Sequence, residues 1–163
     1  MWRRCLVRHL GWEQYGFAQK KFPTHSYKSP GWSWITNPGP TIVHATYLEH
    51  AKVISCAITL ADDRYPFGEV KSGQLVLKAL TLPAPLEDET VLYSMDIGPS
   101  GKRRPKGNNC LLLLGYAVNK SFIALVVERQ NDGFYIRIGK ALGTYGSDLW
   151  SAEDAEMQQI TII

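Results

Sequence analysis

Apolar and polar residues alternate along the middle of the chain. Between Lys52 and Leu60 apolar residues recur at every second position, and residues 74–82 repeat this pattern before Pro83 and Pro85 interrupt it. Successive side chains of a strand point to opposite faces of a sheet, so a period of two predicts strands in both segments. Shorter runs at 41–47 and 91–97 are further strand candidates.

Two longer apolar runs follow, at residues 110–118 and 121–128. Asn119 and Lys120 join them, and a two-residue connection is typical of a tight hairpin. Because nearly every residue in these runs is apolar, we expect central strands that are covered on both faces.

The sequence Asn131-Asp132-Gly133 is a strong turn signal, and it leads into an alternating run at 134–139. The two hydrophobic runs and this segment therefore predict a meander of three strands. Tyr135 and Arg137 share one face of the last strand, where they could read a ligand from the sheet surface. The simpler interpretation is that an amphipathic strand carries polar residues on its outer face.

Residues 29–35 place Trp32 and Trp34 two positions apart, between Pro30 and a second proline-rich segment at 37–40. In an extended segment both indoles lie on one face, so we predict a short edge strand whose tryptophans pack into the core. An aromatic platform for a sugar or a base is the alternative.

The two ends of the chain differ from its middle. Residues 1–10 carry Trp2, Leu6 and Leu10 at helical spacing, and residues 11–28 hold scattered aromatics without a clean period. We therefore expect an N-terminal covering segment over 1–28 and a single β-rich domain over 29–163. Near the other end, a capping box predicts a short helix over 152–157, and 160–163 predicts a final strand.

Together these segments predict a mainly β protein: an antiparallel sandwich or barrel of about eight or nine short strands, with one or two short helices. A chain of 163 residues is long enough for one such domain with a proper core. No uninterrupted apolar run approaches the ~20 residues of a membrane span. We therefore expect no membrane association.

Positive charge is concentrated in one segment. The net charge is +3, and it would be negative without the four cations of the Gly/Pro/Asn-rich stretch 98–109, which are Lys102, Arg103, Arg104 and Lys106. We interpret this stretch, the basic loop, as a solvated and mobile connection. Nucleic-acid binding is the less favoured interpretation, because short basic runs are common in loops.

The residue types that carry catalysis or bind metal form no recognised pattern. The four histidines lie in the first third and fit no zinc motif, and phosphate-binding glycine loops and nucleophile elbows are absent from the sequence. We therefore predict no catalytic residue, no metal and no cofactor. A hydrolase assembled from distant carboxylates such as Asp62, Asp96 and Asp148 stays open as an alternative, although nothing selects them.

The three cysteines, Cys5, Cys56 and Cys110, are widely separated and odd in number. They suggest neither a disulfide framework nor a zinc site, so we expect reduced thiols and a cytoplasmic protein.

Several short motifs resemble a known family, in matching order and spacing. The segment Tyr27-Lys28-Ser29-Pro30-Gly31-Trp32-Ser33-Trp34 is similar to the Y-R-A-P-S-W-S-W segment that follows the HET domain in fungal heterokaryon-incompatibility (HET) domain proteins. Residues 67–77 resemble the F-G-x-V-x-x-G-x-L-x-L step of that family, and 135–139 resemble its Y-x-R-V-G strand. Residues 154–163 are like its closing D-A-E-x-x-x-I-T-I-I.

The resemblance implies the C-terminal β-rich region of such a protein without the HET domain itself, which would lie before residue 1. Its expected role is a non-catalytic accessory module, structural or recognition, in non-self recognition and cell death. Expected partners are proteins, or the HET domain outside this chain. Trp32, Trp34 and Arg137 would be structural anchors. The rival hypothesis is a lectin-like sandwich in which exposed aromatics, among Trp12, Trp32, Trp150 and Tyr135, stack on a sugar.

Overall fold

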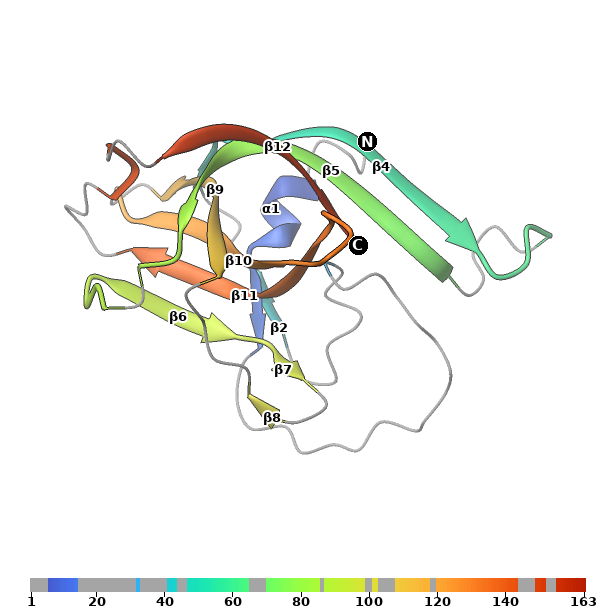
Figure 1. The fold of residues 1–163 in the computed structure, drawn as a ribbon, viewed down its shortest axis with the longest axis horizontal. Coiled ribbons are helices and arrows are strands. Elements are labelled where there is room, and N and C mark those ends of the chain that lie inside the picture. The colour runs from blue at the N-terminus through green and yellow to red at the C-terminus, as the bar shows by residue number, and fades with distance from the viewer. Residues whose placement is uncertain are drawn as a thin grey trace.

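The computed structural model describes residues 6–14, 32, 41–43, 47–64, 70–85, 87–98, 101–102, 108–117, 120–143, 149–151 and 155–163. Strands dominate this part of the chain (Figure 1). The helical elements are α1 (Leu6–Leu10) and the 3-10 helix η3 (Leu149–Ser151). The strands are β1 (Trp12–Gln14), β2 (Thr41–Val43), β3 (Tyr47–Glu49), β4 (Lys52–Leu60), β5 (Val70–Pro83), β6 (Val91–Met95), β7 (Ile97–Gly98), β8 (Gly101–Lys102), β9 (Asn109–Ala117), β10 (Phe122–Arg129), β11 (Tyr135–Gly143) and β12 (Glu156–Ile162).

One eight-stranded sheet organises the molecule, in the order β3-β9-β10-β11-β12-β5-β4, with β6 also paired to β11. The end of β5 pairs in addition with β9, so β5, β9, β10, β11 and β12 form a closed ring. The β11–β12 pairing is parallel and short, whereas the other pairings of the sheet are antiparallel. The mainly β, sandwich-or-barrel class that the sequence predicts is therefore confirmed, with small two-stranded ribbons added by β1–β2 and β7–β8.

The two apolar runs at the centre of the sequence form the hairpin β9–β10, as predicted. Alternate residues of these strands enter two separate cores. One core holds Leu112, Leu114 and Leu125 with β5, β12 and α1, and the other holds Leu111 and Val126 with β6, β11 and Trp150. The continuous hydrophobicity thus has a physical cause, since a strand buried on both faces has no solvent side to make polar.

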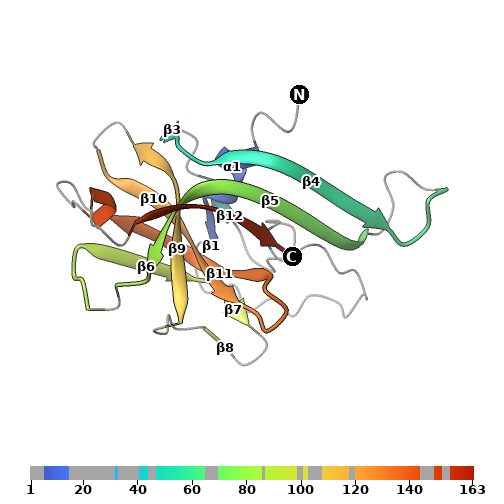
Figure 2. The same cartoon turned by 45° about the horizontal axis from the view of Figure 1, so that its top comes forward.

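α1 covers the first core, where Val7 and Leu10 are buried (Figure 2). This helix agrees with the helical spacing of Leu6 and Leu10 in the sequence. The next segment is different from the prediction, because Trp12–Gln14 forms strand β1 and not a covering loop or helix. β1 pairs with β2, so an unexpected partner from residues 41–43 determines its conformation.

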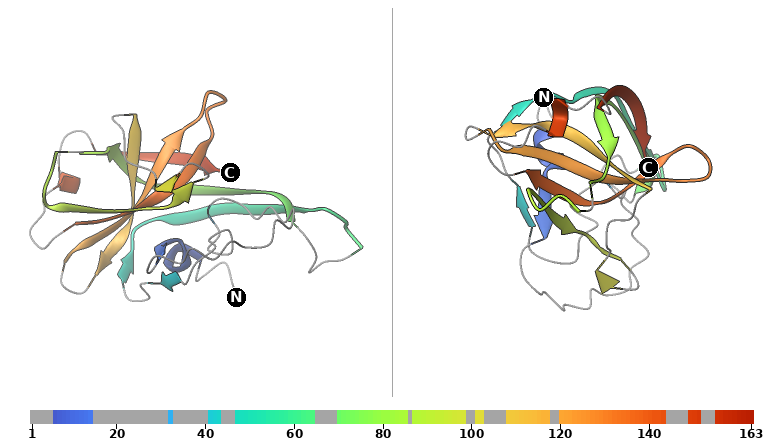
Figure 3. Two further views of the ribbon diagram at one scale, coloured as in Figure 1. Left: turned by 90° about the horizontal axis from the view of Figure 1, so that it is seen from below. Right: turned by 60° about the vertical axis from the view of Figure 1, so that its left-hand side comes forward.

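β4 and β5 form a long hairpin that reaches beyond the body of the sheet (Figure 3). Its register shifts twice. An extra residue, Ile54, lies on β4 between Val53 and Ser55, and an extra residue, Lys71, lies on β5 opposite the step from Thr59 to Leu60. Such bulges increase local twist, and the hairpin projects with much of both its faces exposed.

Two local predictions are corrected, and the basic stretch is described only at its ends. Trp32 lies in a turn and not in a strand, while Trp34 falls outside the described residues. Glu156 and Met157 belong to β12 and not to a helix, because β12 pairs with β5 from Glu156 onward, where the Thr81 hydroxyl donates to the Glu156 carbonyl at 3.2 Å. The basic stretch begins as the β7–β8 ribbon and ends in β9, where Asn109 is buried.

Candidate functional site

A buried cation, Arg137 on β11, is the centre of a cluster of hydrogen bonds, an ion pair and an aromatic contact. A β-bulge creates this position. Val126 of β10 pairs with Gly139 and Val127 pairs with Arg137, so Ile138 is an extra residue on β11. The Ile138 carbonyl then accepts the Asp96 N–H at 2.9 Å, which holds the turn between β6 and β7 beside the bulge. Bulges of this kind re-aim neighbouring side chains.

Gly139 allows this close approach of β6 to β11. A Cβ atom at Gly139 would lie 2.7 Å from the Ser94 carbonyl oxygen and 2.9 Å from the Met95 Cα, both of which are backbone atoms. A larger residue would push β6 away and would move Asp96 with it. The glycine of the Tyr-Ile-Arg-Ile-Gly segment therefore has a packing role in the cluster.

The Arg137 guanidinium is held by four groups. It lies over the Trp12 ring with its Cζ atom 3.3 Å from the centroid, and its Nη2 donates to the Trp12 carbonyl at 2.7 Å. Nη2 also lies 3.4 Å from Asp96 Oδ1, and Nε donates to the Gly139 carbonyl at 3.5 Å. Stacking and hydrogen bonding on one tryptophan fix the orientation of both residues.

Trp12 extends the cluster to a third segment. Its Nε1 donates to the Trp32 carbonyl at 3.2 Å, and both indoles are buried, with exposed fractions of 2% for Trp12 and 8% for Trp32. The contacts join β11, β1, the β6–β7 turn and the turn at Trp32, which are far apart in sequence. We call Trp12, Trp32, Asp96 and Arg137 the arginine–tryptophan cluster.

The electrostatics of the cluster are those of a desolvated cation with one partner acid. Burial lowers the pKa of Arg137 to about 10, and the Asp96 carboxylate opposes this shift. The guanidinium therefore stays charged at neutral pH. The Asp96 side chain is 20% exposed and that of Arg137 is fully buried, so water reaches the ion pair only at the carboxylate. Among the described residues, neither Arg137 Nη1 nor Trp32 Nε1 has a hydrogen-bond partner.

The prediction that Arg137 belongs to the solvent side of its strand is wrong, because Trp12 covers it and leaves the residue only 4% exposed. Tyr135, which was expected to share that side, is partly buried against the first core. An amphipathic pattern alone could not reveal this, since the covering residue lies 125 positions away along the chain.

The three tryptophans proposed for sugar stacking are not available for it. Trp12 is inside the cluster, and Trp150 is buried at 8% exposure, edge-to-face with Phe122 at a centroid distance of 5.5 Å. Stacking on a sugar requires an accessible ring face. The exposure on which the lectin-like hypothesis depends is therefore lacking at Trp12, Trp32 and Trp150.

The basic loop lies mostly outside the described residues. Lys102 belongs to β8, whereas Arg103, Arg104 and Lys106 are not described.

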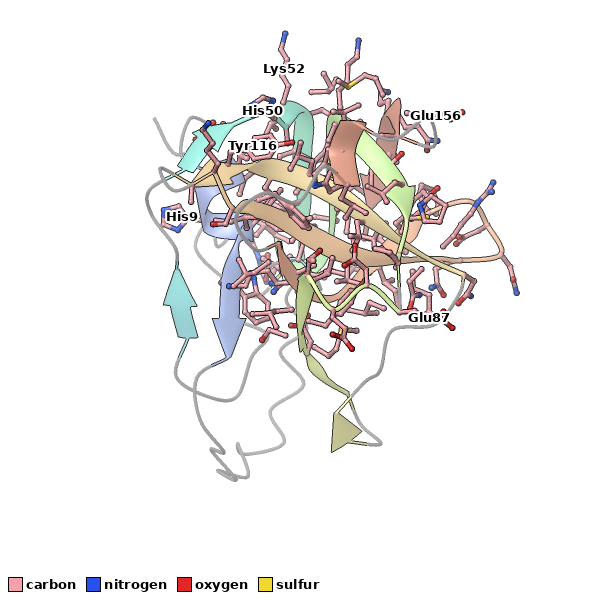
Figure 4. The ribbon with its side chains drawn as sticks, turned by 90° about the vertical axis from the view of Figure 1, so that its left-hand side faces the viewer. His9, His50, Lys52, Glu87, Tyr116 and Glu156 are labelled. Atoms are coloured by element: carbon pink, nitrogen blue, oxygen red, sulfur yellow. The ribbon has the colours of Figure 1, made fainter. Side chains whose placement is uncertain are left out.

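The two described carboxylates among those singled out for a hydrolase are each paired with an arginine. Asp62 pairs with Arg64, with Nη2 2.6 Å from Oδ2, and Asp96 pairs with Arg137, while Asp148 is outside the described residues. Among the described residues, no group of three or more histidine, cysteine, aspartate or glutamate side chains could hold a metal ion. His50 instead packs edge-to-face on Tyr116, at a centroid distance of 5.1 Å (Figure 4).

Sequence reasoning missed one buried cation. Lys140 on β11 is fully buried between Leu125 and Ser94 in the strand register. The signal in the sequence was a single basic residue inside the small and apolar run Ile138 to Leu142. Its burial shows that β11 carries two cations, Arg137 and Lys140, away from solvent.

Comparison of the chain with protein-family models, curated proteins and solved structures finds no match. The resemblance to the C-terminal region of HET-domain proteins therefore rests on the residues quoted above. Within the described part of the chain, no helix is both long and apolar enough to span a membrane.

Proposed function

We propose that this chain is a non-catalytic, β-rich accessory module of a fungal HET-type protein, with a structural or recognition role in non-self recognition and cell-death signalling. It would act in the cytoplasm through protein partners, among them a HET domain, and not through nucleic acid.

One observation carries the proposal. The described residues of the resembling motifs that are buried hold the fold together: Trp32, Gly73, Leu75, Leu77, Arg137, Ile138, Gly139, Ile160 and Ile162. A motif that preserved an enzyme's active centre would place polar groups around an accessible site. Motifs whose residues pack the core are typical of a scaffold that a family shares, which agrees with an accessory module.

The arginine–tryptophan cluster adds a reason for the spacing of these motifs. Arg137 from the Tyr-Ile-Arg-Ile-Gly strand bonds the Trp12 carbonyl, and the Trp12 indole bonds the carbonyl of Trp32 from the Ser-Pro-Gly-Trp segment. Residues from two separate motifs therefore meet through Trp12. This meeting supports Trp32 and Arg137 as structural anchors.

The experiment is recovery of the native product from its own source with an antibody against this chain, followed by intact-mass measurement and sequencing of every recovered protein. A strain that lacks the gene is the control. The expected result is a product with a HET domain before residue 1, or a chain of 18.3 kDa that brings down a separate HET-domain protein. An 18.3 kDa chain recovered without any HET domain contradicts the proposal.

A further inference from the structure

Within the described part of the sheet, β4 is an edge strand. It pairs with β5, and no other strand in the described part of the sheet pairs with it. Alternate backbone N–H and C=O groups of an edge strand point outward and offer a template for another strand. Proteins usually protect such an edge with proline or with charge near its middle. β4 has neither between Val53 and Leu60.

The exposed surface of this edge is apolar. Ile54 is 45% exposed and Ile58 is 54% exposed, and both lie on β4. The bulge at Ile54 breaks the regular strand near its start, but β4 continues without an extra residue from Ser55 to Leu60. The projecting hairpin carries this regular segment away from the body of the molecule, where a second strand can approach it (Figure 3).

We propose that two copies of this chain associate by antiparallel pairing of their β4 strands, about a two-fold axis at Ala57. Such an axis sets Ser55 opposite Thr59 of the second copy, Cys56 opposite Ile58, and Ala57 opposite Ala57. Hydroxyl pairs and apolar pairs are favourable across antiparallel strands. The exposed Ile58 side chains then cover the edges of the cores at Cys56, and each interaction occurs twice.

The charges at the ends of β4 favour the antiparallel arrangement. Lys52 stands at the start of the strand and projects away from the sheet (Figure 4). Asp62, Asp63 and Arg64 follow its end, with Asp62 bonded to Arg64, so this end carries one net negative charge. Antiparallel pairing brings the unlike ends together, whereas parallel pairing would bring like charges together.

The other apolar edge offers a comparison. β6 pairs only with β11 among the described strands, and its Leu92 is 61% exposed. Glu89 precedes β6 and Asp96, which is paired with the buried Arg137, follows it, so neither end of β6 offers a basic residue that could face an acid of a second copy. β4 is also longer. These differences assign the self-pairing edge to β4, independently of the accessory function proposed above.

The first test measures mass against concentration by light scattering on the full chain. A short strand pairing buries little surface, so we expect a mass that rises from 18.3 kDa toward twice that value as concentration increases. Ile58→Lys should keep the mass of one copy, because it puts a charge into the apolar pair. Leu92→Lys is the matched control, with the same charge change on the other exposed edge strand, and should associate like the wild type.

A wild-type mass that stays at one copy up to about 1 mM overturns the proposal. Loss of association in Leu92→Lys with retention in Ile58→Lys also overturns it, because β6 would then be the interface. Circular dichroism of each variant checks that the fold is retained, which the exposure of both side chains makes the expected result.

The second test fixes the register, in a background with Cys5→Ser, Cys56→Ala and Cys110→Ser. Two cysteines from Ala57→Cys would face each other, whereas those from Thr59→Cys would be offset by about 13 Å along the strands. A bifunctional maleimide too short for that offset should link Ala57→Cys copies and leave Thr59→Cys copies and the background unlinked. Equal linking of the two variants, or linking of Thr59→Cys alone, rejects the axis at Ala57.

Discussion

Replacement of Arg137 by methionine is the sharpest test of the arginine–tryptophan cluster. Methionine keeps much of the volume of arginine but removes the charge and every donor. The Trp12 carbonyl then loses the 2.7 Å bond from Nη2, the Trp12 ring loses the guanidinium stacked at 3.3 Å, and Asp96 loses its ion pair. Trp12 and, through it, Trp32 then lose their bond to β11, whereas the β6–β7 turn keeps the bond from the Asp96 N–H to the Ile138 carbonyl.

The magnitude follows from these losses. A buried carbonyl left unsatisfied costs about 1–3 kcal/mol, and a desolvated cation–π contact contributes about 2 kcal/mol. Removing a buried guanidinium from a low-dielectric site offsets part of this loss, and Asp96 can hydrate through its 20% exposed surface. We therefore expect the free energy of unfolding to fall by about 3 kcal/mol, a large share of the ~5–15 kcal/mol of a typical domain.

Urea unfolding followed by tryptophan fluorescence measures the effect. Arg129→Met is the matched control, because Arg129 is exposed on the neighbouring strand β10, and it should change stability by less than about 0.5 kcal/mol. Arg137→Lys should recover little, since an ammonium cannot stack and form the same bonds together. If Arg137→Met unfolds at the same urea concentration as Arg129→Met, the cluster does not stabilise the fold.

Three further measurements follow from single contacts. Gly133 has φ of +84° in the turn before β11, and no atom lies near the position of its missing Cβ. Gly133→Ala should therefore lower the free energy of unfolding in urea by about 1 kcal/mol, and Gly133→Asn should lower it less. If both variants are as stable as the wild type, the positive φ imposes no cost. Burial raises the pKa of Tyr93 to about 12, with Asp88 adding to the shift. Folding favours the neutral phenol, so its contribution to stability is present below about pH 10 and is lost as pH rises toward 12. Tyr93→Phe should remove one late step from the ultraviolet titration of the tyrosines. An unchanged titration contradicts the raised pKa. Burial also raises the pKa of the Cys110 thiol, against the influence of Arg129. Iodoacetamide should therefore modify Cys110 more slowly at neutral pH than a cysteine in an unfolded peptide, as peptide mass mapping can measure, and an equal rate contradicts this.

Local patterns in the sequence were sufficient for the strands with local partners. The alternation of β4, the long apolar runs of β9 and β10, and the turn at Asn131 to Gly133 all depend on neighbours within one hairpin. Their side-chain period and their turn residues can be recognised from consecutive positions in the sequence. The hairpins and the mainly β class were predictable for this reason.

Segments with distant partners were not predictable. Glu156 and Met157 have the composition of a helix start, yet β5 provides backbone partners 75 residues away and draws them into β12. Trp12 lies in a segment without periodicity and becomes a strand because β2 pairs with it. In both cases tertiary hydrogen bonding overrides the weak local preference.

The candidate site divides along the same line. The sequence by itself determined that Trp32 and Arg137 were anchors worth attention and that the chain would be a sheet with one apolar hairpin at its centre. Only the tertiary structure decided that Arg137 faces inward, that Trp12 covers it, and that β4 is an edge strand of the described sheet. Periodicity describes which side of a strand a residue takes, but whether that side meets solvent or another segment depends on the closure of the whole sheet.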